Sequence, residues 1–354
     1  MEKTKVAVIG CGTIANSAHG PSYQKNPNVK IAYCVDIIPE RAQAFKEKFG
    51  DEDTVALTDY HDFLSDESVK AVSVCVPNYL HNPITITCVR AGKNVLCEKP
   101  ASVSYNLAKE MADVAHETGK ILNIGVVNRF NYAVNMIKKY VEEGRLGDVY
   151  HVYCSFRAHR SIPGLGGPFT TKELAGGGVL IDWGVHFLDL ILYVLGGAKL
   201  KTVTCDAYCE MAKDMKSYKY EGMWAEDTAD VEHGTNDVDD LITGHIRTDK
   251  ASISFNGAWA QNLDKNEMYI DFLGDKCGAR LTYGDKFELT DGSTLKTEQP
   301  EYDIPNMYLQ ENKAFIESIT TGEKKRCHID SILESAKLLD VLYASAEKKE
   351  EIKL

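Results

Sequence analysis

The residue best placed for chemistry is a lysine at the end of an apolar strand. The run Asn94-Val95-Leu96 has the composition of a buried strand and leads into Cys97-Glu98-Lys99-Pro100. An ammonium group at the end of a core strand is costly unless its charge is used. Two interpretations are open: Lys99 pairs with Glu98, or it faces a substrate hydroxyl and takes part in proton transfer.

A second set of residues suits dinucleotide binding. Gly10-x-Gly12-x-x-Ala15 follows the apolar run 5–9 and opens a helical segment, which is the context that this motif requires. The glycines let the backbone approach a diphosphate, which then lies at the helix N-terminus. Asp36 ends the second apolar run, where a carboxylate binds ribose hydroxyls and repels a 2′-phosphate. The sequence therefore favours NAD over NADP. Arg41, one turn later, is the one residue that argues for NADP. The alternative to nucleotide binding is a glycine turn that binds no nucleotide.

A third set follows the glycine-rich run 176–178. Apolar spacing predicts that a helix begins here, which places Asp182, His186 and Asp189 on one face. An Asp/His pair on one face suits proton transfer, whereas the alternative is a structural histidine in a salt bridge. No third ligand has the spacing of a metal site, so we predict no metal.

Composition limits the class of protein. A chain of 354 residues is long enough for two domains. The net charge of −12 argues against nucleic-acid binding. The ten cysteines include no Cys-x-x-Cys pair, which indicates free thiols in a reducing compartment. No signal peptide precedes the first strand and no apolar run approaches the ~18 residues that span a bilayer, so we expect a cytoplasmic protein.

The elements that must position these residues divide the chain into two domains. Through residue 125, β-branched runs alternate with segments of helical spacing, which predicts an α/β domain with a doubly wound parallel sheet, the Rossmann arrangement. The expected strands are 5–9, 29–35, 71–76, 94–97 and 121–126. The expected helices are 39–49, 83–91 and 103–118.

Residues 126–354 form the second predicted domain, an α+β domain for substrate binding and oligomerisation. Its strands alternate polar and apolar residues, which predicts an open, mostly antiparallel sheet. These strands are 149–157, 202–209, 241–247, 252–259, 267–273 and 279–283. The polar stretch 212–235 is predicted to be an inserted loop. Helices 308–320 and 329–347 close the chain, and the last is a candidate for packing back onto the Rossmann domain.

These motifs together resemble the Gfo/Idh/MocA family of NAD(P)-dependent sugar oxidoreductases, which includes glucose–fructose oxidoreductase and inositol dehydrogenase. The resemblance rests on the glycine loop, Val76-Pro77-Asn78-x-x-His81, Glu98-Lys99-Pro100, Gly-Gly-Gly-x-x-x-Asp182-x-Gly-x-His186 and Val126-Val127-Asn128-Arg129-Phe130. It implies that Lys99, Asp182 and His186 are catalytic, that the substrate is a carbohydrate or cyclitol, and that the C-terminal sheet carries the substrate pocket and the interface of a homo-oligomer.

The resemblance also implies a set of contacts and roles. The cofactor set is Gly10, Gly12, Thr13, Ile14, Asp36, Arg41, Pro77, Asn78, His81, Glu98, Lys99 and Asn128. The substrate set is Lys99, Arg129, His159, Arg160, Phe169, Asp182 and His186. Lys99 would hold the reacting hydroxyl and His186 would take its proton, although either could be the base. Asp182 would orient the imidazole or bind a neighbouring hydroxyl.

The segment 160–169 departs from the Trp-Arg segment of many family members and is rich in glycine. We expect it to face the substrate and to leave room for an aglycone. That expectation ranks C3 oxidation of a glucoside ahead of oxidation of an inositol. The alternatives are an inositol 2-dehydrogenase, an NAD-dependent glycoside-eliminating enzyme and a non-catalytic dinucleotide-binding regulator.

Overall fold

The chain forms two compact units. The computed structural model describes residues 3–284 and 286–354. Unit 1 contains Met1–Phe130 and Asn306–Leu333, and unit 2 contains Asn131–Pro305 and Glu334–Leu354. This division differs from the prediction in two ways. The first part of unit 1 ends at Phe130 and not at residue 125, and unit 1 also contains the segment 306–333. The last helix, by contrast, belongs to unit 2.

Unit 1 is built on a six-stranded sheet, sheet A, with the strand order β3-β2-β1-β4-β5-β6. Every pair of neighbouring strands is parallel. This order is that of the doubly wound dinucleotide-binding fold, so the predicted fold class is confirmed. The short edge strand β3 was not predicted. The strands are β1 Thr4–Ile9, β2 Val29–Val35, β3 Val55–Leu57, β4 Val69–Val74, β5 Asn94–Glu98 and β6 Leu122–Gly125.

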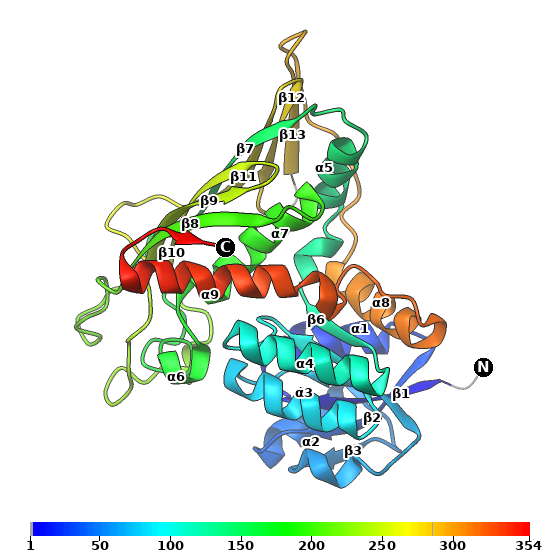
Figure 1. Ribbon diagram of the computed structural model, residues 1–354. Helices are drawn as coiled ribbons and strands as arrows, with labels where there is room; N and C mark the ends of the chain where they lie inside the picture. Colours follow the sequence, from blue (N-terminus) through cyan, green and yellow to red (C-terminus); the bar gives the residue numbers. More distant parts are fainter. Residues whose placement is uncertain (1–2, 285) are drawn as a thin grey trace. The chain divides into compact units, whose positions relative to one another are not determined.

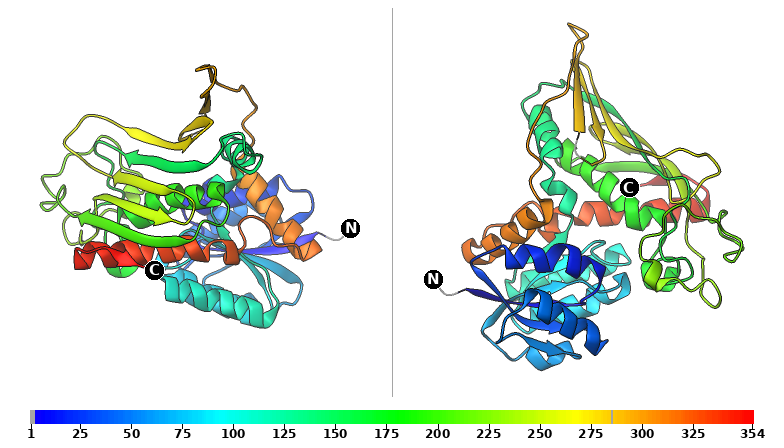
Figure 2. Two further views of the ribbon diagram at one scale, coloured as in Figure 1. Left: turned by 45° about the horizontal axis from the view of Figure 1, so that its top comes forward. Right: turned by 180° about the vertical axis from the view of Figure 1, so that it is seen from behind.

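Helices cover both faces of sheet A. α3 and α4 lie side by side over one face in Figure 1, and the view from behind in Figure 2 shows α1 and α2 over the other. The helices are α1 Gly20–Gln24, α2 Pro39–Phe49, α3 His81–Arg90, α4 Tyr105–Thr118 and α8 Met307–Thr321. A π-helix, η1 Ala15–His19, precedes α1. The 3-10 turns are η2 Tyr60–Phe63, η3 Asn78–Leu80, η4 Val127–Phe130 and η7 Ile329–Ser331.

Unit 2 is built on a nine-stranded sheet, sheet B, with the order β14-β13-β12-β11-β7-β10-β9-β8-β15. Among the described strands of sheet B, only β7 and β10 form a parallel pair, so the prediction of a mostly antiparallel sheet is confirmed. β13, β14 and β15 were not predicted. The strands are β7 Val149–Arg157, β8 Leu200–Tyr208, β9 Leu241–Thr248, β10 Ser252–Ala258, β11 Glu267–Gly274, β12 Cys277–Thr282, β13 Lys286–Asp291, β14 Thr297–Glu298 and β15 Ile352–Lys353.

One face of sheet B carries the core of unit 2. Side chains of that face pack with α5 Tyr132–Glu142, α7 Val185–Leu195 and α9 Leu333–Lys348. The left view in Figure 2 looks onto the other face, over which the described chain places no helix. The short helix α6 Lys172–Ala175 and the π-helix η5 Leu180–Gly184 precede α7. The polar insert between β8 and β9 contains one short turn, η6 Glu226–Thr228.

One stretch of described helix, Lys172–Leu195, is long and apolar enough to cross a membrane by length and composition alone. Of its most apolar window, 83% is buried inside the protein. α7, which forms most of this stretch, packs within the core of unit 2. Burial of this kind is expected of a core helix, so the stretch is weak evidence for a membrane span.

Candidate active site

The glycine loop of unit 1 has the geometry that the motif predicted. Gly10 has a φ of +87°, and a Cβ at this position would lie 2.3 Å from the carbonyl oxygen of Cys75. Only glycine meets both conditions. A Cβ at Gly12, by contrast, would meet no atom within 4 Å. Ala15 is fully buried against the strands, which lets the following helix pack closely. The loop thus leaves open space beside Gly12 at the start of a helix, where a diphosphate fits.

Asp36 is buried at the end of β2 and holds the glycine loop in place. Its Oδ2 accepts the N–H of Cys11 at 2.9 Å, and its Oδ1 accepts the N–H of Ile38 at 2.9 Å. A carboxylate has about four lone-pair sites, so two remain for ribose hydroxyls. Asp36 therefore fits a bound NAD and also fixes the loop that would receive it. Thr13 and Arg41 are both exposed, and Ile14 is half-buried.

Glu98 is buried behind Lys99 in a chain of hydrogen bonds. Its Oε1 lies 2.8 Å from His19 Nε2, and His19 Nδ1 lies 3.0 Å from the hydroxyl of Ser73. Ser73 in turn lies 2.6 Å from the hydroxyl of Tyr23. The second oxygen of Glu98 accepts the backbone N–H of Lys99 at 3.2 Å. This carboxylate therefore fixes the backbone at the end of β5.

The charge state of Glu98 follows from these contacts. Burial alone would raise its pKa, but the hydrogen bond from His19 and the positive charges of His19 and Lys99 hold the pKa of Glu98 below its usual value. Lys99 itself is half-buried and precedes Pro100 through a cis peptide bond.

His81 has a structural place that the sequence did not reveal. It is buried, with Nδ1 at 2.7 Å from the carbonyl oxygen of Pro100 and Nε2 at 2.9 Å from that of Val76. Burial lowers the pKa of His81, while the two carbonyls act in the opposite direction. Both ring nitrogens are thus engaged by backbone. His81 thus links the segment after β4 to the turn after Lys99, and its predicted contact with the nicotinamide stays a prediction.

Arg129 also has a structural place. The side chain is buried, and Nη1 donates to the carbonyl of Arg326 at 2.7 Å and to the hydroxyl of Ser331 at 2.9 Å. Nη2 donates to the carbonyl of Ser331 at 3.0 Å. These bonds hold η4 against the segment after α8 within unit 1, and the predicted contact of Arg129 with substrate stays a prediction. Asn128, the neighbouring residue of η4, is also buried. Pro77 and Asn78 lie where β4 gives way to η3.

In unit 2, Asp182 and His186 lie at the start of the predicted helix. Asp182 is buried within η5, and His186 is half-buried in the first turn of α7. A π-helix has about 4.4 residues per turn, so residues four apart still share a face. Asp189 is buried and accepts a hydrogen bond from Ser335 of α9 at 2.5 Å. Asp189 is therefore an anchor between two helices.

The three glycines before η5 allow a close approach of other backbone, as their spacing suggested. A Cβ at Gly178 would lie 1.9 Å from the carbonyl oxygen of Asp239, and one at Gly177 would lie 2.1 Å from the hydroxyl of Tyr343. Asp239 is buried and accepts the N–H of Gly178 at 2.8 Å and that of Leu180 at 2.9 Å. Sequence reasoning missed Asp239 and Tyr343, because their partners are distant in the chain.

The glycines of the segment 160–169 lie in close contact with the polar insert. Cβ atoms at Gly166 and Gly167 would lie 2.0 Å and 2.1 Å from the carbonyl oxygens of Asp230 and Thr228. The glycines therefore let the backbone of this segment pack directly on the polar insert. These glycines are therefore no sign of open space, because close backbone contact needs glycine as much as a roomy loop does, and room for an aglycone stays a prediction.

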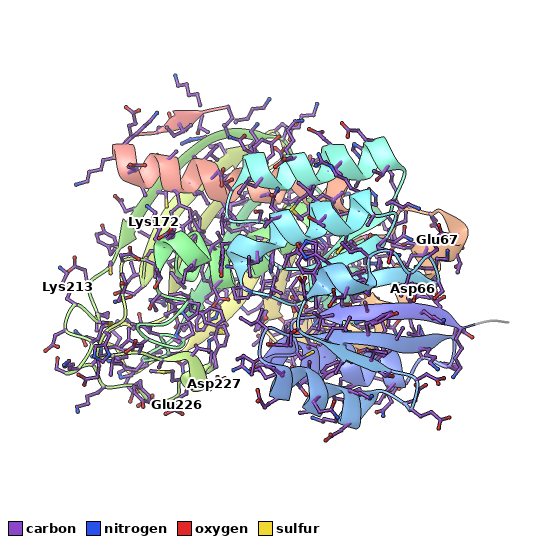
Figure 3. All side chains as sticks on the ribbon, turned by 90° about the horizontal axis from the view of Figure 1, so that it is seen from below. Asp66, Glu67, Lys172, Lys213, Glu226 and Asp227 are labelled. Atoms are coloured by element: carbon purple, nitrogen blue, oxygen red, sulfur yellow. The ribbon has the colours of Figure 1, made fainter. Side chains whose placement is uncertain are left out.

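The remaining predicted substrate residues lie at the two ends of this segment. His159 Nδ1 contacts the carbonyl of Leu263 at 2.8 Å, and the Arg160 guanidinium contacts Asn262 and lies over the ring of Tyr218. Phe169 meets Trp224 edge-on, with ring centroids 4.4 Å apart. Trp224 is 40% exposed on the insert and was also missed by the sequence analysis. Figure 3 labels the neighbouring Glu226 and Asp227 of the insert.

The structure thus assembles two partial sites. The glycine loop, Asp36 and the turn at Lys99 lie in unit 1, where the parallel strands of sheet A end. Asp182 and His186 lie in unit 2, as do Phe169 and Trp224. Within residues 3–284 and 286–354, no group of three or more His, Cys, Asp or Glu side chains is arranged to hold a metal ion.

Comparison with known proteins identifies the family. Residues 4–126 match the model of the oxidoreductase family with an NAD-binding Rossmann fold, and residues 134–280 match the GFO/IDH/MocA C-terminal domain. A D-glucoside 3-dehydrogenase of Escherichia coli (strain K12) is 30% identical over 99% of this chain and 97% of its own. A myo-inositol 2-dehydrogenase of Thermotoga maritima is 28% identical over 54% of this chain and 55% of its own.

Solved structures agree on the fold. A levoglucosan dehydrogenase in complex with NADH and levoglucosan has a TM-score of 0.84 at 21% identity, covering 99% of both chains. The family models together with the D-glucoside 3-dehydrogenase span nearly the whole sequence. This chain is therefore a member of the Gfo/Idh/MocA family, an NAD-dependent dehydrogenase that acts on the CH–OH group of sugars or cyclitols.

Proposed function

We propose that this enzyme oxidises a ring secondary hydroxyl of a sugar, with C3 of a glucoside as the preferred position. The observation that carries this choice is the 30% identity to a D-glucoside 3-dehydrogenase over nearly all of both chains. The retained Lys99, Asp182 and His186 support turnover rather than binding alone. The exposed ring of Trp224 against Phe169 offers an apolar face of the kind that lines sugar pockets.

Unit 1 would hold NAD through its backbone and one carboxylate. The open space at Gly12 suits the diphosphate, and the free lone pairs of Asp36 suit the adenosine ribose. When bound, NAD accepts the hydride that leaves the sugar carbon. The remaining work falls to residues that hold the sugar hydroxyl and take its proton.

The proposed chemistry draws one residue from unit 1 and two from unit 2. Lys99 would donate a hydrogen bond to the reacting hydroxyl and stabilise the negative charge that develops on its oxygen. The electron pair of the C–H bond leaves with the hydride, and the hydroxyl proton passes to His186 or Lys99. Asp182 would orient the imidazole or bind a neighbouring hydroxyl.

We further propose that the enzyme works as a cytoplasmic homo-oligomer that pairs through the open face of sheet B. A register row of side chains crosses that face and mixes aromatic, basic and acidic groups, as protein interfaces do. The row is Thr204, His245, Ser254, Tyr153, Asp271, Arg280 and Glu288. All ten cysteines are free, as expected in a reducing compartment.

A substrate screen tests the proposed function. Methyl glucosides, free hexoses and inositols are incubated with NAD while NADH absorbance is followed, and products are identified by NMR. We expect the highest kcat/KM on a glucoside, with a stable 3-keto product. Faster turnover of an inositol would assign an inositol dehydrogenase. Glycoside cleavage without net NADH would assign an eliminating enzyme, and no turnover at all would assign a regulator.

Lys99→Met tests the role of the lysine. We expect kcat to fall by about 10²–10⁴-fold, the usual contribution of a proton-handling group, while NADH still binds. Lys93→Met is the matched control, because Lys93 precedes the same strand and its ammonium donates to the carbonyl of Asp66. The control should lower stability without lowering kcat. Near-normal turnover in Lys99→Met would refute the assignment.

Asp36→Asn tests the basis of cofactor preference. The amide removes the negative charge but keeps one oxygen acceptor for the loop. We expect NADH affinity to fall by about tenfold, because a hydrogen bond to a charged group is lost, and discrimination against NADPH to relax. Affinities for both cofactors are measured by fluorescence titration. An unchanged preference would exclude a contact between Asp36 and the ribose.

Gly12→Ala tests where the diphosphate lies. Since a Cβ here meets no atom within 4 Å, the thermal unfolding temperature should not change. The methyl group would crowd the diphosphate, and overpacking of this kind should weaken NADH binding by about tenfold or more. Gly222→Ala is the control, because it is equally open but lies in the insert. Equal NADH affinities in the two variants would move the cofactor away from this loop.

A further inference from the structure

Asp239 binds the start of the segment that carries Asp182 and His186. Its Oδ1 accepts the N–H of Gly178 at 2.8 Å, and its Oδ2 accepts that of Leu180 at 2.9 Å. The amide between them, Val179, donates to the backbone carbonyl of Asp239 at 2.8 Å. Three successive amides at the beginning of a helical segment therefore end on one residue, and these are the groups that a helix cannot satisfy internally.

Tyr343 completes this arrangement from α9. Its hydroxyl donates to Asp239 Oδ1 at 2.8 Å. Burial raises the pKa of both Asp239 and Tyr343. The glycines at 177 and 178 are required here, because a side chain at either would overlap Tyr343 or Asp239. The segment 176–180 is thus fixed by hydrogen bonds and by close packing on two sides.

We propose that Asp239, with Tyr343, is a positioning residue for catalysis: it sets the place of Asp182 and His186 by holding the amides of residues 178–180. This inference rests on the proposed function, in which those two side chains serve the reacting hydroxyl. Asp182 lies two residues after Leu180, whose amide is the last that Asp239 accepts, and His186 lies in the first turn of α7. A displacement of about 1 Å in such a segment can cost about 100-fold in rate.

The neighbouring residue supplies a matched control. Asp240 is as buried as Asp239, and its Oδ2 also accepts two backbone amides, those of Glu210 at 2.7 Å and Met211 at 2.6 Å. Those amides belong to the beginning of the insert, which bears Lys213 in Figure 3, and not to the segment that leads into α7. Asp240→Asn therefore removes a comparable structural interaction without touching the residues before Asp182.

The test compares Asp239→Asn with Asp240→Asn. In Asp239→Asn the amide group turns a donor toward one backbone N–H, because each carboxylate oxygen accepts a different amide. In Asp240→Asn the amide oxygen can still accept both N–H groups, but the charge of that acceptor is lost. Both variants should therefore have lower thermal unfolding temperatures. We expect only Asp239→Asn to lower kcat, by about tenfold or more, with NADH affinity unchanged because the glycine loop belongs to unit 1. Equal kcat values in the two variants would overturn the proposal.

A second readout does not depend on turnover. The ring signal of His186, assigned in ¹H–¹³C NMR spectra by its loss in His186→Gln, should shift in Asp239→Asn and stay in place in Asp240→Asn. If Asp239→Asn does not fold, Tyr343→Phe carries the test, since it removes one hydrogen bond and leaves both amides an acceptor. Tyr343→Phe should shift the same signal and lower kcat by a smaller factor.

The two hypotheses fail separately. If the wild-type enzyme oxidises no ring hydroxyl, the proposed function is wrong, while the His186 signal still decides whether Asp239 positions it. If the wild type is active but Asp239→Asn keeps both its kcat and the His186 signal, the positioning role is wrong and the proposed function stands.

Discussion

Three buried carboxylates each accept backbone amides, and these hydrogen bonds fix the turns that carry the candidate site residues. Asp36 accepts two amides around the glycine loop, and Glu98 accepts the amide of Lys99 together with His19. Asp239 accepts two amides ahead of Asp182. In each case the carboxylate fixes the backbone, and the backbone amides in turn stabilise the buried carboxylate.

The parts of the protein that were predictable from the sequence are those whose signals are local. Sheet A and its helices follow from β-branched runs that alternate with helical spacing, and β2 and α2 have the bounds that the pattern indicated. The glycine loop was predictable because its context, strand then helix, is local. Short strands such as β3 and β14 were not predicted, because two or three residues are too few to show a periodic pattern.

Residue roles that depend on distant partners were not predictable. Arg129 and His81 have side chains typical of binding sites, yet each is engaged by carbonyls contributed by other segments. The sequence shows the donors and not the acceptors, because every backbone residue offers the same carbonyl. Glycines have the same ambiguity. Those at 166 and 167 mark close backbone contact, whereas Gly12 marks open space, and only coordinates separate the two.

Cofactor preference is tied to the fold of the glycine loop through Asp36. Its two oxygens accept two different amides. One is that of Cys11 in the glycine loop, and the other is that of Ile38, which follows Asp36 in the chain. A serine here has one side-chain oxygen and an alanine has none, so neither supplies the two separate oxygens that these amides use. A change from NAD to NADP that simply removes the charge would therefore also leave a loop amide without its acceptor. Under the proposed function, in which Asp36 binds the ribose, selectivity for the 2′-position and the conformation of the glycine loop would both depend on this one side chain.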